Sequence, residues 1–196
     1  MEREVEDLAA LAAKAGGPAL VFGNSSGAAL ALDAAAGLVP ITKLAVYEPP
    51  FIVDGSRPPI PGSYRADLAA LLAADRRGDA VELFLTSAAG VPAEYVAPMR
   101  ADPSWAGFEA VAHTLAYDAA LMDGTVGGKP LPADRWAMVT APTLVIDGGA
   151  SPPQMGSAAQ ALAGLLPHAA RCTLSGQSHE VDPALLAATL TEFFTA

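Results

Sequence analysis

Short apolar runs alternate with helical segments along this chain, and this alternation restricts the fold more than any other feature. Four runs have the length, the apolar content and the flanking Gly, Pro or charged residues of buried strands: 19–23, 43–48, 141–147 and 170–174. Segments of helical character precede, separate or follow them: 3–15, 27–37, 154–167 and 183–194. Strands that are apolar on both faces and alternate with helices predict an α/β fold with a parallel sheet.

A long insertion interrupts this pattern between the second and third strands. It spans residues 49–133, about 85 residues, whereas a crossover between parallel strands needs only about a dozen. A proline-rich stretch at 56–62 is followed by three helical segments: 63–78, 78–90 and 104–122. We therefore predict a core made of residues 1–48 and 134–196, with residues 49–133 as a helical cap.

The composition supports a globular chain and limits its partners. Hydrophobic residues make up 52% of the chain, but no apolar run reaches the roughly 18–20 residues that span a membrane. The formal net charge of −10 argues against nucleic acid and anionic membrane surfaces as partners, because both are polyanions. Cys172 is the single cysteine, so an internal disulfide is excluded and we expect a reducing, cytoplasmic environment. No metal-ligand spacing or dinucleotide-binding glycine pattern occurs, so we expect neither a metal nor a cofactor.

The sharpest motif is Gly-Asn-Ser-Ser-Gly at residues 23–27, between the first strand and the following helix. It fits the pattern G-x-S-x-G, whose central serine lies on a strained turn with its hydroxyl beyond the strand end. This context favours Ser25 as a nucleophile and the N–H of Ser26, at a helix start, as an oxyanion donor. We expect Gly23 and Gly27 to prevent collisions where strand and helix meet. The turn alone equally fits a helix cap made by the two serines.

A serine hydroxyl needs a neighbouring base, and the chain has three histidines. His168 is expected to face solvent at a helix end, and His113 lies within a helix of the insertion. His179 lies on the loop between the last strand and the terminal helix. In a parallel sheet, this loop and the turn at Ser25 meet at the same carboxyl edge, where open α/β sheets carry their sites. His179 is therefore the best candidate for the base.

With Ser25 first, an inserted cap and His179 last, the chain resembles the α/β-hydrolase superfamily. The resemblance covers essentially the whole chain and is carried by four phrases: GNSSGAALALDAAAG, LAVYEPPF, APTLVIDGGASP and GQSHEVDP. It implies an α/β-hydrolase-like sheet with a helical cap, and acyl transfer through a covalent intermediate on the serine. Asn24 stands where the family commonly has histidine, which implies a different polarity of the pocket.

The acid that completes a catalytic triad is displaced from its usual place in the family. The resemblance implies an aspartate shortly after the third strand, but Ser151 stands there. Some relatives place the acid after the strand that follows the nucleophile helix, and in this sequence that residue is Glu48. Asp147, at the end of its own strand, is the alternative, although a carboxylate before two glycines also suits a turn. We favour Glu48, which would orient His179 and stabilise its cationic form.

The resemblance also implies four strands and a His-Gly loop ahead of the strand at 19–23, and these do not occur in this sequence. That loop supplies the family's second oxyanion donor, so we expect weak catalysis unless another group replaces it. The strand at 19–23 then becomes an apolar edge, which invites pairing with another chain. We expect a homo-oligomer that covers this strand, or else a longer protein whose further part does so.

Together these features predict a serine hydrolase that acts on an ester, thioester or lactone of an apolar small molecule. Its pocket is expected to include residues that equally suit an ordinary core: Asn24, Phe51, Trp105, His113, Tyr117 and Met122. Two alternatives keep the fold. One is a non-hydrolytic cyclase or lyase that uses His179 and Glu48 as acid and base, and the other is a ligand-binding protein.

Overall fold

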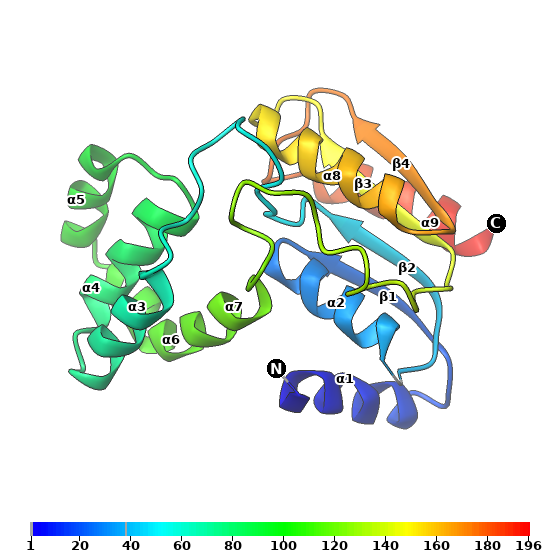
Figure 1. The fold of residues 1–196 in the computed structure, drawn as a ribbon, viewed down its shortest axis with the longest axis horizontal. Coiled ribbons are helices and arrows are strands. Elements are labelled where there is room, and N and C mark those ends of the chain that lie inside the picture. The colour runs from blue at the N-terminus through cyan, green and yellow to red at the C-terminus, as the bar shows by residue number, and fades with distance from the viewer. Residues whose placement is uncertain (1, 38) are drawn as a thin grey trace. The chain divides into compact units, whose positions relative to one another are not determined.

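The computed structural model describes residues 2–37 and 39–196 of the chain (Figure 1). Its internal contacts divide it into two compact units. The sheet unit comprises Met1–Pro58 and Gly124–Ala196, and the helical unit comprises Pro59–Asp123. Within the described residues, no helix combines the length and the apolar character that crossing a membrane requires.

The sheet unit is built on four parallel strands: β1 (Ala19–Asn24), β2 (Ile41–Tyr47), β3 (Thr143–Gly148) and β4 (Ala169–Leu174). Their order in space follows their order in the chain, so β1 and β4 form the edges of the described sheet. Every residue of β3 is buried, as expected for a central strand covered on both faces. The predicted α/β fold with a parallel sheet is confirmed, and each strand lies within two residues of its predicted bounds.

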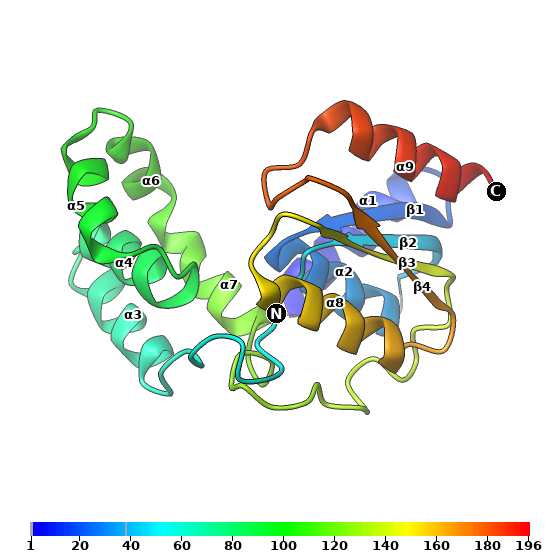
Figure 2. The ribbon, with the colours of Figure 1, turned by 90° about the horizontal axis from the view of Figure 1, so that it is seen from above.

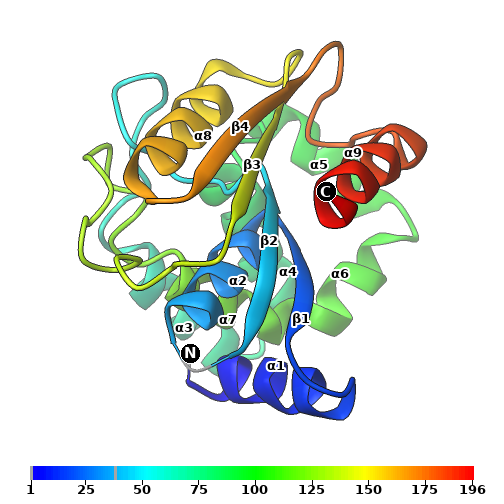
Figure 3. The ribbon, with the colours of Figure 1, turned by 90° about the vertical axis from the view of Figure 1, so that its right-hand side faces the viewer.

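Helices cover both faces of this sheet. Figures 2 and 3 show α2 (Ser26–Ala36) and α8 (Pro153–Leu165) on one face and α9 (Pro183–Thr195) on the other. The α9 face is an apolar cluster in which strand residues meet partly buried side chains of the helix: Ala45, Tyr47, Leu144, Ile146, Leu186, Leu190 and Phe193. Helix α1 (Glu2–Lys14) packs against α2 through Ala12 and Ala34. Helix α9 is capped by Asp182, whose carboxylate accepts the N–H groups of Ala184 and Leu185.

The helical unit contains five short helices: α3 (Tyr64–Ala73), α4 (Arg77–Leu83), α5 (Ala93–Ala101), α6 (Trp105–Val111) and α7 (Leu115–Leu121). A π-helical turn, 84–88, extends α4, and a 3₁₀ turn, 112–114, separates α6 from α7. Two small apolar clusters hold these helices together, one around Leu68 and one around Trp105. Helix α5 is absent from the sequence prediction because Pro98 lies inside it and the pattern of apolar residues there is weak.

The junctions between the units differ from the predicted boundaries of the cap. Residues 49–58 and 124–133 belong to the sheet unit rather than to the helical unit. Ile52 explains this, because its N–H donates to Thr125 O at 2.8 Å and its carbonyl accepts from Gly128 N at 2.9 Å. Phe51 also stacks on Trp136, with ring centroids 5.2 Å apart. The two connecting segments therefore bind one another within the sheet unit.

A cluster of polar groups fastens the residues that follow the second of these segments to α2. The carboxylate of Asp33 accepts two bonds from Arg135, at 2.9 and 2.8 Å, and one from Trp136 Nε1 at 2.8 Å. The guanidinium of Arg135 also lies over the Trp136 ring, 4.9 Å from its centroid. This arrangement satisfies the indole N–H of Trp136, whose side chain is fully buried.

Candidate active site

Ser25 lies at the sharp turn between β1 and α2. Its backbone has φ 55° and ψ −127°, a conformation that costs an L-residue energy unless the surroundings hold it. Its N–H donates to Tyr47 O at 2.9 Å, so the ladder between β1 and β2 continues one residue beyond β1. Glu48, directly after β2, also has a positive φ, 44°. Strain is thus concentrated at two neighbouring strand ends.

The two glycines of the Ser25 turn have different roles. A Cβ on Gly23 would lie 2.5 Å from Gly27 O and 2.7 Å from the Cα of Ala28, so β1 and α2 approach too closely for any side chain there. A Cβ on Gly27 would meet no atom within 4 Å. The expectation that both glycines prevent collisions is therefore correct for Gly23 and wrong for Gly27. Gly27 lies within the first turn of α2 and has open space beside its Cα.

Glu48 and His179 are joined directly. Nδ1 of His179 lies 2.8 Å from Oε2 of Glu48, while Oε1 of the same carboxylate accepts the backbone N–H of Gly148 at 2.8 Å. The Glu48 side chain is fully buried, and the His179 side chain is 42% exposed. The acid is thus enclosed at the end of β2, and the imidazole that it holds reaches toward solvent.

The electrostatic balance at Glu48 favours its ionised form. Burial opposes ionisation and is the largest effect, but hydrogen bonding by His179, Ser151 and the Gly148 N–H together lowers the pKa of Glu48 below its usual value of 4.5. Ser151 Oγ is buried and makes no hydrogen bond of full geometry within the described residues, but it lies close enough to Glu48 to contribute to this lowering. A carboxylate that stays ionised can stabilise a neighbouring imidazolium.

Asp147, the alternative acid, has other partners. Arg171 donates to both of its oxygens, from Nε at 2.8 Å and from Nη2 at 2.9 Å. Thr173 Oγ1 lies 3.1 Å from Oδ1 of the same carboxylate. The Asp147 side chain is 3% exposed, so this pair neutralises a charge that would otherwise be costly to bury. The contacts therefore favour Glu48 over Asp147 as the partner of His179.

The predicted pocket residues lie in both units. Asn24 is exposed at the end of β1, and Phe51 is buried against Trp136 in the sheet unit. In the helical unit, Trp105 and Met122 are buried, whereas His113 and Tyr117 are exposed. The ring contact gives Phe51 a packing role, and Trp105 Nε1 donates to Glu109 within the same helix. A role for these six residues in a pocket stays a prediction.

Sequence reasoning missed two contacts that hold the His179 loop. The hydroxyl of Tyr47 donates to the backbone carbonyl of Ser178, and Gly148 approaches Gln177 so closely that a Cβ on Gly148 would lie 2.4 Å from Gln177 O. In the sequence, Tyr47 is only an apolar strand residue and Gly148 only a turn glycine. Contacts with residues so far along the chain have no signal in local spacing.

The family follows from a match that spans nearly the whole chain. The family model described as "Alpha/beta hydrolase family" matches residues 2–189. The chain belongs to the α/β-hydrolase family. A comparison with curated protein sequences gives no match.

Solved structures agree with this assignment. The crystal structure of an alpha/beta hydrolase from Sphaerobacter thermophilus DSM 20745 is 54% identical to this α/β hydrolase, with a TM-score of 0.87 over 98% of this chain and 74% of that one. MenH from S. aureus is 20% identical, with a TM-score of 0.59 over 97% and 73% of the two chains. The 2-hydroxy-6-oxo-6-phenylhexa-2,4-dienoate hydrolase BphD from Rhodococcus sp. strain RHA1 is also 20% identical, with a TM-score of 0.52 over 91% and 64%. The last two likenesses establish the shared fold only.

Proposed function

We propose that this α/β hydrolase is a serine hydrolase that cleaves an ester, thioester or lactone of an apolar small molecule through an acyl-Ser25 intermediate. The observation that carries the proposal is the bond between the buried Glu48 carboxylate and His179, at the end of the strand next to the strained turn at Ser25. Ser25 and Glu48 follow paired ends of adjacent strands, since Asn24 is the register partner of Tyr47. Tyr47 accepts the N–H of Ser25 with its carbonyl and donates its hydroxyl to the carbonyl of Ser178, the neighbour of His179.

The protonation of His179 suits a general base. Because the ionised Glu48 carboxylate can only accept, Nδ1 of His179 must carry the proton in the bond between them. In the neutral imidazole, Nε2 then keeps its lone pair and can accept the Ser25 proton. The orientation of the ring and its tautomer thus follow from one contact.

The reaction proceeds in two halves. His179 Nε2 removes the Ser25 proton as Oγ forms a bond to the acyl carbon, and the resulting imidazolium protonates the leaving alcohol, thiol or ring oxygen as its bond breaks. Water then attacks the acyl carbon and gives one proton to His179; as the bond from the acyl carbon to Ser25 Oγ breaks and the acid leaves, the imidazolium returns that proton to Oγ and restores the Ser25 hydroxyl. The N–H of Ser26, the first residue of α2, is the proposed donor to the developing oxyanion. The reaction as proposed uses no metal or cofactor.

The proposed location is the cytoplasm, because the chain has a single cysteine and so no internal disulfide.

Two adjacent serines provide a sharp test. The substitution Ser25→Ala is expected to abolish labelling by a fluorophosphonate and turnover of p-nitrophenyl esters. Ser26→Ala is the matched control, because it removes the neighbouring hydroxyl and keeps the Ser26 N–H. Labelling that survives Ser25→Ala would overturn the assignment. Absence of labelling in the folded wild type would favour the non-hydrolytic or ligand-binding alternative.

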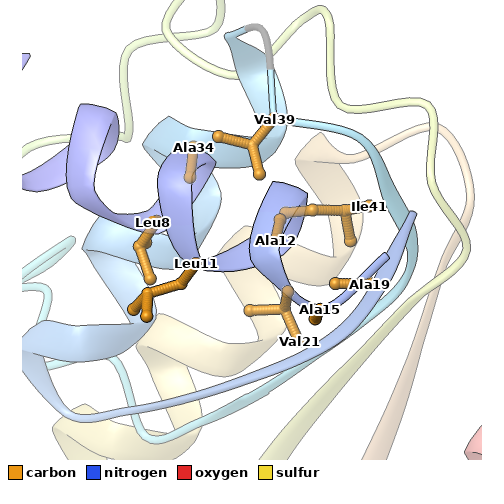
Figure 4. A pocket seen from close by; sticks show the side chains of 9 residues that line it. All are labelled: Leu8, Leu11, Ala12, Ala15, Ala19, Val21, Ala34, Val39 and Ile41. Carbon is orange, nitrogen blue, oxygen red and sulfur yellow. The ribbon is translucent and has the colours of Figure 1, made fainter. Parts of the chain in front are cut away.

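We further propose that a second copy of this chain covers β1. One face of this edge strand exposes Leu20 at 52% and Phe22 at 37%. Its other face borders an apolar groove of about 210 Å³ between α1 and β1, which Leu11 and Val21 help to line (Figure 4). The strand contains no charged residue or proline, the usual protection of an exposed edge. Pairing of β1 with its own copy about a two-fold axis would place apolar side chains opposite one another.

The solution mass tests this second proposal. Sedimentation or light scattering is expected to give a dimer, and Leu20→Lys, at a half-exposed edge position, is expected to shift the mass toward the monomer. Tyr95→Lys introduces the same charge at an exposed apolar position of the helical unit and is the matched control. A monomeric wild type at all protein concentrations would contradict the proposal.

A further inference from the structure

Tyr47 contacts segments that are far apart in the sequence. It is the last residue of β2 and is fully buried. Its carbonyl accepts the N–H of Ser25 at 2.9 Å, and its hydroxyl donates to the carbonyl of Ser178. Its neighbour in the chain is Glu48. One residue of β2 therefore connects the segments that carry the proposed nucleophile, acid and base.

The Tyr47 hydroxyl is suited to act as a permanent donor. Burial, reinforced by the negative charges of Glu48 and Asp147, raises the pKa of Tyr47 to about 12. The hydroxyl therefore keeps its proton at neutral pH and can donate it to the carbonyl of Ser178. The backbone of Tyr47 is also fixed, because it is paired with both neighbouring strands, opposite Asn24 and Ile146.

The loop that carries His179 needs such an anchor. Besides the bond between His179 and Glu48, the loop is held at Gln177, whose carbonyl accepts Ala150 N at 2.8 Å and whose side chain accepts Asp182 N at 2.8 Å. The bond from Tyr47 acts on the residue directly before His179. Because the His179 side chain is 42% exposed, neighbouring side chains do not enclose it. Its orientation therefore depends on the Ser178–His179 peptide and on the bond to Glu48.

We propose that Tyr47 is a positioning residue that holds the Ser178–His179 peptide so that the imidazole stays on Glu48 and turned toward Ser25. This proposal rests on the proposed serine-hydrolase function. Tyr47 itself touches neither the substrate nor the reacting atoms. Its role is to limit the conformations of the His179 loop before substrate binds.

The substitution Tyr47→Phe removes only the hydroxyl. A buried neutral hydrogen bond of ordinary strength predicts a fall of about fivefold in the rate of fluorophosphonate labelling and in kcat, with KM unchanged. Amide hydrogen exchange in residues 175–181 should accelerate by a similar factor, whereas exchange in β3 should not change. Tyr64→Phe is the matched control, because Tyr64 is a buried tyrosine of the helical unit. It is expected to leave the loop exchange and the kinetics as in the wild type.

Labelling and amide exchange together distinguish a failure of this proposal from a failure of the proposed serine-hydrolase function. If the wild type is not labelled at Ser25, the proposed function fails, but the exchange of residues 175–181 still decides whether Tyr47 holds the loop. Wild-type exchange in this loop of the folded Tyr47→Phe protein would refute the proposal. Faster exchange spread evenly over β2 and β3 would refute it as well, because that result indicates a loss of core stability instead.

Discussion

The substitution Glu48→Gln tests the site most directly, because the geometry dictates which way the new amide must face. Gly148 N–H points at the position of Oε1, 2.8 Å away, so this position must remain an acceptor. The amide oxygen of the glutamine therefore faces Gly148, and its NH₂ faces Nδ1 of His179 at the position of Oε2. A donor there forces the proton of the neutral imidazole onto Nε2, which can then no longer accept the Ser25 proton.

The expected loss is large. Replacing the acid of a serine triad by its amide leaves the shape intact and lowers kcat by about 10⁴-fold, because the histidine is held in the wrong tautomer. We expect a fall of about 10³–10⁴-fold in kcat for p-nitrophenyl esters, and a comparable fall in the rate of fluorophosphonate labelling. Wild-type circular dichroism would show that the variant is folded.

Asp147→Asn is the matched control for this experiment. It makes the same chemical change in a buried carboxylate at the end of the next strand, whose partners are Arg171 and Thr173 rather than His179. We expect this variant to lose stability but to keep kcat within about tenfold of the wild type. A folded Glu48→Gln protein with near-normal kcat would refute the reasoning. So would a folded Asp147→Asn protein without activity, because it would make Asp147 the acid.

Three further changes test the physical arguments about the fold and the acid. Gly23→Ala should lower the free energy of unfolding by about 1–3 kcal/mol or more, because its Cβ would meet the backbone of Gly27. Gly27→Ala should instead raise the free energy of unfolding by about 0.5–1 kcal/mol, because alanine has the higher helix propensity and the space beside Gly27 is open. Urea titration measures both changes. Because the folded-state pKa of Glu48 is lowered below 4.5, its ionisation adds stability that is present above this pH and is lost as the pH falls through the folded pKa. The excess free energy of unfolding of the wild type over Glu48→Gln should therefore shrink as the pH falls below about 4.5. Asp33→Ala should lower the free energy of unfolding by about 3 kcal/mol, because Arg135 and the buried Trp136 N–H lose their acceptor. A thermal melt that matches the wild type would contradict this.

The elements of the sheet unit were predictable because their signals are local. Mostly apolar runs of five to seven residues, flanked by Gly, Pro or charged residues, indicate both the type of element and its bounds to within two residues. Strand β3 illustrates this with six buried residues in a row. The G-x-S-x-G pattern likewise locates the strained turn at Ser25 from five adjacent residues. The proximity of Glu48 and His179 followed from topology, because carboxyl ends of parallel strands share one edge.

What the sequence could not supply depends on contacts between distant residues. The junctions of the helical unit lie inside the predicted cap because Ile52 bonds to Thr125 and Gly128, a pairing without any periodic signal. The anchoring of Ser178 by Tyr47 is of the same kind, since an apolar strand pattern describes where the ring goes but not the partner of its hydroxyl. At Gly27 the sequence prediction claimed too much: the motif suggested that a side chain there would collide, but the space beside Gly27 is open.

The strain at Ser25 leads to a last prediction that is independent of any activity assay. With φ 55° and ψ −127°, residue 25 adopts a conformation that glycine reaches freely and that an L-residue reaches only at a cost in energy, and the bond from Ser25 N to Tyr47 O holds it there. Ser25→Gly should therefore be more stable than Ser25→Ala by about 1 kcal/mol, even though glycine loses more entropy on folding.

At the next position the order should reverse. Ser26 is the first residue of α2, so Ser26→Ala should be more stable than Ser26→Gly by about 0.5–1 kcal/mol. Urea denaturation of the four variants gives both differences under identical conditions. The same order at both positions would mean that the backbone at residue 25 relaxes in solution. In that case a strained turn could not be what holds the hydroxyl of the proposed nucleophile beyond the end of β1.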